Sequence, residues 1–249
     1  MIASLPMYDR VETAAANNEF WVLIRDNLRA QSIPAPDKLD RTADIWETWE
    51  SPDLVLSQTC GLPYRTKLHG HVNLVGALDF NFPQVPAGYY YSQLVVGKDA
   101  SETLSDFKDA ILAVNGYDSQ SGWAAPQNFA KEQGFAFHNT QITGGHLNSA
   151  FAVADGKADI ASLDAVTWRL ILRYHPETVE RLKVLAHTPP TPGLPLITAR
   201  TVDGKIVAQA VETAIDNLSE IHRETLGIRG IVDIPSDLYI SVPTPDCLS

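Results

Sequence analysis

Short apolar runs alternate along the chain with longer stretches in which apolar residues recur at helical spacing. Runs such as "DLVLSQTC" (53–60) and "ADIASL" (158–163) have the length and composition of buried strands. In the stretch 10–30, Phe20, Ile24 and Leu28 recur at i, i+4 and i+8. This spacing predicts an amphipathic helix, and Asp9 just before it is a candidate cap.

The predicted elements alternate in type along most of the chain. Strands are expected at 2–7, 53–60, 72–78, 90–96, 111–115, 135–143, 158–163, 182–187 and 194–200. Helices are expected at roughly 10–30, 123–133, 146–155, 164–174 and 204–219. Such alternation is typical of an α/β fold and predicts mainly parallel sheets.

Two proline-rich segments, "FNFPQVPAGYYY" (80–91) and "HTPPTPGLP" (187–195), interrupt this alternation. They predict a chain that leaves one lobe and later returns to it. The first lobe is expected to comprise 1–87 and 193–249, and the second 88–192. Two chain crossings would then form a hinge, and a cleft between such lobes is a natural ligand site.

The charge balance narrows the class of ligand. The chain has 19 basic and 30 acidic residues, a formal net charge of −11. This charge argues against nucleic-acid binding and against docking on an anionic membrane. An anionic ligand must therefore be held by local donors, because the overall field repels it.

Other bulk features exclude several further classes. The two cysteines, Cys60 and Cys247, form no CxxC pair and no Cys/His cluster, so neither a zinc site nor a disulfide framework is expected. No cofactor motif is present, and no apolar run is long enough to span a membrane. The start "MIASLPMYDR" shows no signal peptide. A cytoplasmic location is expected for the chain as given, and a periplasmic one if a leader has been removed.

The stretch "NGYDSQSGW" (115–123) is polar and lies between a predicted strand and a predicted helix. Ser119 and Ser121 offer hydroxyls beside Gln120, and Gly122 lets the backbone approach a ligand. The first N–H groups of the helix lack intrahelical partners and carry partial positive charge. The stretch is therefore either a small anion cradle or a turn in which a serine caps the helix.

A second polar junction, "TGGH" (143–146), leads from a predicted strand into a helix that begins with His146. An imidazole in that position can donate a hydrogen bond to an oxyanion, or it is a solvated turn residue. Asp164 follows the next predicted strand. It can accept a hydrogen bond from a ligand that carries a proton, or simply cap the following helix.

Aromatic and polar residues follow other predicted strands. Tyr8 comes after the first, and Tyr64 follows the polar stretch Ser57-Gln58-Thr59. Tyr91 lies at the first crossing. Ligands of open parallel sheets bind beyond the carboxyl ends of the strands, so these residues are expected to line one cleft with the two polar junctions.

The segments "DLVLSQTCGLPY", "GYYYSQLVVGKDA", "AVNGYDSQSGW" and "TGGHLNSAFAVADGKADIASLDAVTW" occur here in the order found in phosphate/phosphonate substrate-binding proteins of ABC transporters. The resemblance covers about 50–200 well and the first 30 residues fairly. It implies the two-lobed type 2 periplasmic-binding-protein fold, an ABC permease as partner, and no catalysis.

The resemblance also implies roles for individual residues. Ser119, Gln120 and Ser121 would grip the ligand oxygens together with the helix start, and His146 would donate to the same group. Asp164 would accept from the protonated or amino end of the ligand. Tyr64 and Tyr91 would line the cleft. The chain departs from the family pattern at Gln120, where a hydroxyl residue is usual.

Three functions remain open on the sequence. The first is a binder of a small oxyanion such as phosphate or phosphonate. The second is an enzyme on the same fold, similar to those of menaquinone or thiamin-pyrimidine biosynthesis, in which His146, Asp164 and Cys60 would act as acid, base or nucleophile. The third is a sensory ligand-binding module.

Overall fold

The computed structural model describes residues 1–245 as two compact units. The first unit comprises Met1–Tyr89 and Pro192–Ile240, and the second comprises Tyr90–Thr191 with the described residues from Ser241 onward. The chain passes between the units at 89–90 and 191–192, and again at 240–241. Strands β4 (Tyr89–Tyr90) and β10 (Thr191–Pro192), at the first two passages, pair with each other.

The first unit is built on a five-stranded sheet with the order β1-β2-β11-β3-β12. Its strands are β1 (Ile2–Ser4), β2 (Leu54–Gln58), β3 (Val72–Asp79), β11 (Pro195–Ala199) and β12 (Gly230–Val232). Strand β2 lies inside the sheet, between β1 and β11, and all five of its residues are buried, which explains its continuous apolar start.

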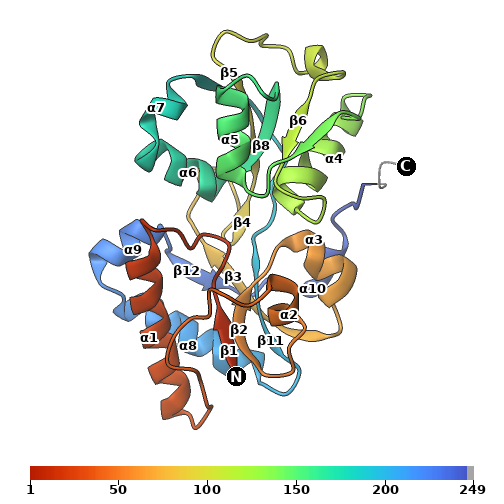
Figure 1. The fold of residues 1–249 in the computed structure, drawn as a ribbon. Coiled ribbons are helices and arrows are strands. Elements are labelled where there is room, and N and C mark those ends of the chain that lie inside the picture. The colour runs from red at the N-terminus through yellow and green to blue at the C-terminus, as the bar shows by residue number, and fades with distance from the viewer. Residues whose placement is uncertain (246–249) are drawn as a thin grey trace. The chain divides into compact units, whose positions relative to one another are not determined.

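Helices cover this sheet. They are α1 (Ala14–Ala30), α2 (Ile45–Trp49), α3 (Gly61–Pro63), which continues into the π-helical turn η1 (Tyr64–Leu68), α8 (Gly204–Asn217), α9 (Glu220–Leu226) and α10 (Ser236–Ile240). Helix α1 packs on α8 and α9, as Figure 1 shows. The predicted apolar stripe of Phe20, Ile24 and Leu28 is confirmed, since all three side chains are buried.

The predicted cap of α1 is wrong. Thr13 occupies the N-cap position, and its side chain makes no capping bond to the helix. Asp9 instead accepts a hydrogen bond from Asn17 Nδ2 at 3.1 Å and pairs with Arg41 at 2.5 Å. The chain makes one more turn before the helix begins, and Asp9 is used to tie that turn to its neighbours.

The second unit has a five-stranded sheet with the order β7-β6-β8-β5-β9. Its strands are β5 (Ser92–Gly97), β6 (Leu112–Val114), β7 (Thr140–Ile142), β8 (Ile160–Asp164) and β9 (Leu182–His187). Its helical elements are η2 (Leu104–Phe107), the π-helical turn η3 (Gln120–Ala124), α4 (Ala125–Glu132), α5 (His146–Ala154), α6 (Ala165–Tyr174) and α7 (Pro176–Val179).

Both sheets are mixed, so the prediction of mainly parallel sheets is wrong. Strand β11 runs antiparallel to β2 and β3, and β5 runs antiparallel to β8 and β9. Each of these two strands directly follows one of the paired passages, β4 or β10, and lies inside its sheet. A chain that arrives from the other unit does not follow the strand–helix–strand crossover that keeps neighbouring strands parallel.

The strand predicted at 135–143 is shorter than expected. Only Thr140–Ile142 pair with a neighbouring strand. Before them, the Gln127 side chain takes both backbone groups of Phe137: Nε2 donates to the carbonyl at 2.7 Å and Oε1 accepts from the N–H at 3.1 Å. These backbone groups are therefore satisfied by a side chain and not by a strand.

Candidate ligand-binding site

The carboxyl ends of three parallel strands meet at one edge of the second unit. Strand β6 is parallel to both β7 and β8. Beyond β6 the chain enters η3, beyond β7 it enters α5, and β8 leads directly into α6. This edge therefore gathers three helix starts, each with N–H groups that lack intrahelical partners.

Ser119 is the N-cap of η3. Its Oγ accepts from the N–H of Gly122 at 3.0 Å, so the capping role that the sequence left open belongs to this serine. The Ser121 carbonyl accepts from Ser92 Oγ on β5 at 3.0 Å and from Ser162 Oγ on β8 at 2.6 Å. Two strands thus fix the position of the Ser121 backbone.

The sequence did not single out these two anchoring serines. Ser92 and Ser162 are almost fully buried, at 2% and 1% exposure, within strands that are otherwise mainly apolar. A small hydroxyl residue inside a buried strand needs a hydrogen-bond partner. A serine within a predicted buried strand was therefore the signal in the sequence that could have indicated a supporting role. The identity of that partner depends on how β5 and β8 lie beside η3.

Gly122 and Asn115 are in close contact in the turn. A Cβ added to Gly122 would lie 1.8 Å from Asn115 Oδ1 and 3.2 Å from His146 Cε1. Only glycine fits there without movement of its neighbours. Asn115 Oδ1 is buried without a hydrogen-bond partner among the described residues. Asn115 was also not predicted as a site residue.

Gln120 is buried, at 2% exposure. Its carbonyl accepts from the N–H of Ala125, the bond that closes the π-helical turn. The backbone of Gln120 is therefore part of the start of the helix. Its larger side chain occupies buried space beside the two serines.

The side chains of Ser121, His146 and Asp164 come together at this edge. His146 Nε2 lies 2.8 Å from Ser121 Oγ and 3.5 Å from Asp164 Oδ2. The side chains of His146 and Asp164 are 12% and 4% exposed. Asp164 also caps α6, because its Oδ1 accepts from the N–H of Thr167 at 2.8 Å. Its second oxygen remains directed at the imidazole.

This geometry differs from that of a catalytic triad. In a triad the hydroxyl and the carboxylate bind opposite nitrogens of the imidazole, so that the carboxylate orients the ring while the other nitrogen takes the proton. Here Ser121 and Asp164 approach the same atom, Nε2 of His146. The arrangement suits donation and acceptance around a bound group better than relay of a proton.

Tyr91 lies beside this edge because β5 is antiparallel to β8. Ser92, the next residue, is in register with Asp164. The Tyr91 carbonyl accepts from the N–H of Ala165 at 3.0 Å, and its ring lies 4.9 Å from that of His187. Tyr91 is thus a close neighbour of Asp164 within the second unit.

The predicted tyrosines of the first unit are packing residues within it. Tyr8 is buried, with its ring edge-to-face against Phe80 at 5.5 Å. Tyr64, in η1, is 2% exposed and packs against Tyr239 at 5.1 Å. Burial raises the pKa of Tyr64 above its ordinary value. Contact of Tyr8 and Tyr64 with a ligand stays a prediction.

The same unit holds a polar sequence at the carboxyl end of β2. Ser57, Gln58 and Thr59 are buried, at 0%, 3% and 0% exposure. Ser57 Oγ, Gln58 Nε2 and Thr59 Oγ1 make no hydrogen bond within 1–245. A buried polar atom without a partner costs about 1–3 kcal/mol. These three side-chain atoms are therefore left unsatisfied by the described residues.

Within the described part of the chain, no cluster of three or more His, Cys, Asp or Glu side chains is arranged to hold a metal ion. Cys60 is buried, and Cys247 lies outside the described residues. No helix in 1–245 has both the length and the apolar character needed to cross a membrane.

Two α/β units, each with an antiparallel strand inside its sheet that follows a passage of the chain between the units, are typical of a two-lobed periplasmic binding protein. A model of the family described as "ABC transporter, phosphonate, periplasmic substrate-binding protein" matches residues 82–233, more than half of the chain. The chain belongs to this family. No curated protein gives a significant match.

Solved structures agree on the fold. PhnD1 from Prochlorococcus marinus in complex with methylphosphonate is similar with a TM-score of 0.70 and 16% identity, over 96% of this chain and 93% of that one. XAC2383 from Xanthomonas citri bound to a chloride ion gives a TM-score of 0.69 and 13% identity, over 97% of each chain. A binding-protein component of an ABC phosphonate transporter from Pseudomonas aeruginosa gives a TM-score of 0.62 and 16% identity, over 90% of this chain and 77% of that one.

Membership of this family gives the function in general terms. The chain is a solute-binding protein of the ABC phosphonate-transporter type, and the family consists of binding proteins and not of enzymes. Such proteins bind a small ligand and interact with a permease.

Proposed function

We propose that the chain binds a small tetrahedral oxyanion, a phosphonate or phosphate, and that its donors are centred on Ser121 and His146. The observation that carries this proposal is the convergence of Ser121 Oγ and Asp164 Oδ2 on one nitrogen of His146, at 2.8 and 3.5 Å. Such a set can donate to the oxygens of an anion and accept a proton from it.

The donors would act on the oxygens of the ligand. The N–H groups at the starts of η3 and α5 carry partial positive charge, and His146 in its protonated form adds a full charge. Hydrogen bonds of this charge-assisted kind are the strong ones. They offset the repulsion expected from a chain with net charge −11.

Asp164 would select the ligand by its protons. A buried carboxylate beside an oxyanion is repulsive unless a hydrogen atom lies between the two groups. Phosphate at neutral pH retains a proton, and 2-aminoethylphosphonate carries an ammonium group, whereas sulfate has no proton to offer. The proposal therefore includes discrimination against sulfate.

The remaining ligand contacts would come from the first lobe. The family is two-lobed, and lobes of this kind close on a ligand by hinge motion. Tyr8 and Tyr64 are proposed to contribute there, with Tyr91 beside Asp164. The location is proposed to be the periplasm, where the family acts.

Calorimetric titration tests the proposal with four ligands: methylphosphonate, 2-aminoethylphosphonate, phosphate and sulfate. Binding of at least one of the first three, with sulfate at least about tenfold weaker, is expected. Absence of both heat and thermal stabilisation with all three phosphorus compounds would overturn it.

The variant Asp164→Asn tests the selection step. The amide can donate where the carboxylate only accepts, so sulfate should gain affinity relative to phosphate by about tenfold or more. Asp109→Asn is the matched control, because Asp109 is an exposed aspartate of the same unit. An unchanged phosphate-to-sulfate ratio in Asp164→Asn contradicts the role of Asp164.

A further inference from the structure

The first unit has a cavity at the edge of its sheet where β2 and β3 begin. It has a volume of about 560 Å³, within the range of small-molecule sites. The end of α2, the end of η1 and the turn after β11 form its walls. The carboxyl end of β2, with Ser57 and Gln58, is at the opposite end of that strand.

The floor of the cavity is apolar and fixed. Trp49, Leu68, Val72 and Ala199 line it and are buried, at 2%, 1%, 8% and 4% exposure. The indole Nε1 of Trp49 donates to the carbonyl of Gln58 at 3.2 Å, which holds the ring in place. An apolar group laid on this floor would be removed from water without rearrangement of the core.

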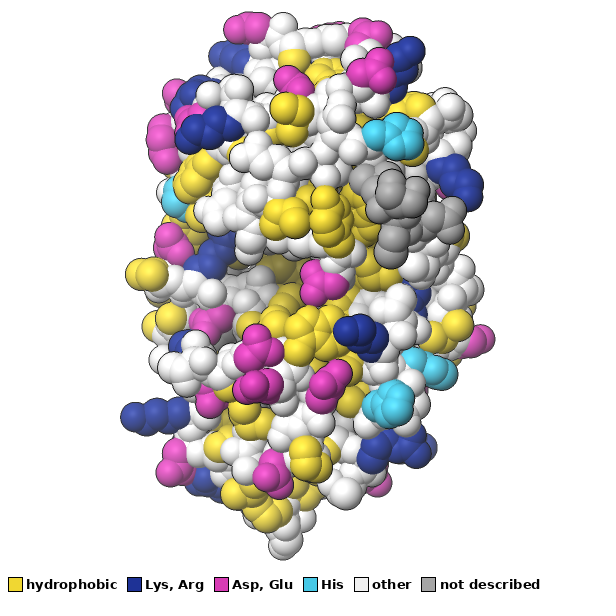
Figure 2. Space-filling view, turned by 45° about the vertical axis from the view of Figure 1, so that its right-hand side comes forward, with side chains coloured by type: hydrophobic (Ala, Val, Ile, Leu, Met, Phe, Trp, Pro, Cys, Tyr) yellow, Lys and Arg dark blue, Asp and Glu magenta, His cyan; other side chains and the backbone are white. Residues whose placement is uncertain are grey.

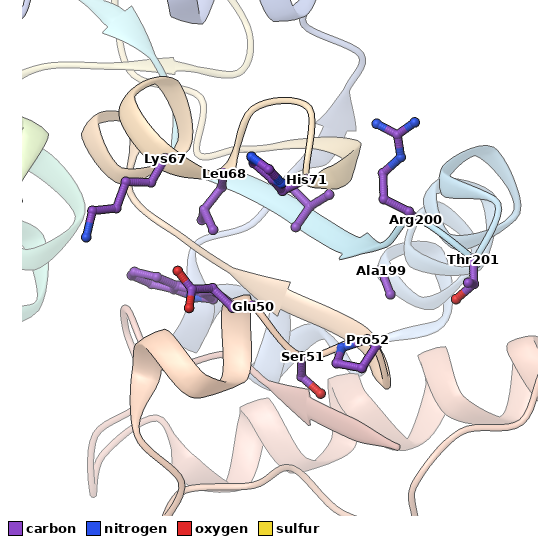
Figure 3. A pocket seen from close by; sticks show the side chains of 11 residues that line it. Glu50, Ser51, Pro52, Lys67, Leu68, His71, Ala199, Arg200 and Thr201 are labelled. Atoms are coloured by element: carbon purple, nitrogen blue, oxygen red, sulfur yellow. The ribbon is translucent and has the colours of Figure 1, made fainter.

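The rim is basic, on a chain that is acidic overall. On the face in Figure 2, histidine and Lys or Arg side chains gather at the lower right, with acidic side chains beside them, and side chains of both charges occur elsewhere on the face. In Figure 3, Lys67, His71 and Arg200 lie along one side of the cavity, and Glu50 lies on the facing side. None of these three basic residues forms an ion pair among residues 1–245.

Two of the basic groups are held in position by their surroundings. Lys67 Nζ lies 4.5 Å from the centre of the Trp46 ring, a cation–π contact. Arg200 Nη1 donates to the carbonyl of Gly70 at 2.7 Å, which uses one of five donor N–H groups. In Figure 3 the guanidinium of Arg200 extends away from the apolar floor, so its remaining donors lie at the outer part of the rim.

The turn that carries His71 is also rigid. Gly70 has φ +82°, which glycine adopts at little cost, and the N–H of His71 donates to the carbonyl of Leu68 at 2.9 Å. Asn73 Nδ2 donates to the carbonyl of Val202 at 2.8 Å and ties the β11 turn to β3. These contacts fix the backbone of the rim, so little backbone entropy is lost on binding.

We propose that this cavity binds a small carboxylate with an apolar body, independently of the oxyanion site. The apolar body would cover the floor, and the carboxylate would meet the basic rim. With His71 neutral, Lys67, Arg200 and Glu50 sum to one positive charge, which matches a monoanion better than a doubly charged phosphate. Arginine adds the fork geometry that recognises a carboxylate.

Titration of the ¹⁵N-labelled protein with 4-phenylbutyrate tests the proposal. Saturable shifts are expected for the amides of Leu68, Val72 and Ala199, and equally in the variant Ser121→Ala, which alters only the oxyanion site. The neutral 4-phenylbutanamide should bind at least about tenfold more weakly. No saturable shift at these amides up to about 10 mM carboxylate, or equal binding of the amide, overturns the proposal.

Substitutions at the rim complete the test. Lys67→Met with Arg200→Gln should weaken binding by about tenfold or more. Lys205→Met is the control, since Lys205 is exposed nearby but does not line the cavity. If the double variant does not fold, the affinity of Lys67→Met alone is the test. Methionine keeps an apolar side chain over the Trp46 ring and removes only the charge. Unchanged affinity in a folded rim variant contradicts the proposal.

Discussion

At the carboxyl end of β8 in the second unit lies Asp164, in contact with His146, which also contacts Ser121. At the carboxyl end of β2 in the first unit lie Ser57 and Gln58, whose buried side-chain atoms Oγ and Nε2 make no hydrogen bond among the described residues. The second unit thus has a donor set that is already assembled. The first unit offers polar atoms that have yet to find a partner.

The difference has a structural cause. In the second unit three parallel strands end at the same edge, and each leads into a helix start. In the first unit only β1 and β2 are parallel neighbours, and the next strand, β11, runs the other way. Fewer helix starts can meet there, and the aromatic residues that follow its strands pack into the core. We therefore expect binding energy to depend mostly on the second unit.

The largest effect is expected from His146→Ala and Ser121→Ala. Each removes a group proposed to bond the ligand, and a hydrogen bond to a charged group contributes about 1.5–3 kcal/mol, or about 10–150-fold in affinity. Calorimetry with the ligand that the wild type binds gives the measurement. Ser57→Ala is the comparison in the first unit. If it weakens binding as much as Ser121→Ala, the contrast between the units fails.

A smaller effect is expected from Gly122→Ala. The new Cβ would overlap Asn115 Oδ1, and such crowding typically costs about 1–3 kcal/mol of stability. The double variant Asn115→Ala with Gly122→Ala should recover much of this loss, because the overlapping atom is gone. Chemical denaturation provides the free energies of unfolding.

The control for that pair is Gly97→Ala, since a Cβ there meets no atom within 4 Å. It should change stability far less. Gly122→Ala as stable as the wild type would show that the turn can move, and would weaken the view that the donor set of the second unit is assembled in advance.

The smallest effect concerns the aromatic core of the first unit at high pH. Burial raises the pKa of Tyr239, with Tyr64 as a further cause, and burial also raises the pKa of Tyr64. A group whose folded pKa is raised contributes stability that is fully present below its unfolded pKa, about 10 for tyrosine, and is lost as pH rises beyond it. The first unit should therefore lose stability above about pH 10.

Tyr239→Phe separates the two contributions of this residue. It removes the bond from the hydroxyl to the carbonyl of Gly193 at 2.9 Å, at a cost of about 1 kcal/mol near pH 7. It should also reduce the alkaline loss of stability. Urea unfolding from pH 7 to 11 measures both, with the exposed Tyr117→Phe of the second unit as control. The same alkaline loss in Tyr239→Phe as in the wild type contradicts the assignment.

The sequence predicted much of the fold because local patterns set it. The buried stripe of Phe20, Ile24 and Leu28 can be predicted from helical periodicity alone. The strands β2 and β8 can be predicted from their short apolar runs alone. The direction of β5 and β11 was missed, since strand direction depends on where the chain comes from and not on composition. Asp9 was misplaced as a cap because Asn17 and Arg41 compete for its carboxylate.

For the candidate site, residue types and their place after strands were sufficient to select Ser119, Ser121, His146 and Asp164. Only the tertiary structure shows that Ser119 caps the helix and that Ser121 contacts His146, because both serines are plausible caps in the sequence. Asn115, Ser92 and Ser162 were missed, since a residue that supports a loop is recognised only when the loop lies against it.

The sequence by itself determined the class of protein, an acidic two-lobed α/β binding protein, and the polar loops that follow its strands. These features follow from periodicity, charge and short-range chemistry. The tertiary structure alone decided that Ser121 and Asp164 share one nitrogen of His146, that Gly122 has no room for a Cβ, and that three basic residues lie along one side of an apolar cavity in the first unit. These depend on contacts between residues far apart in the chain, and packing fixes such contacts while local pattern does not.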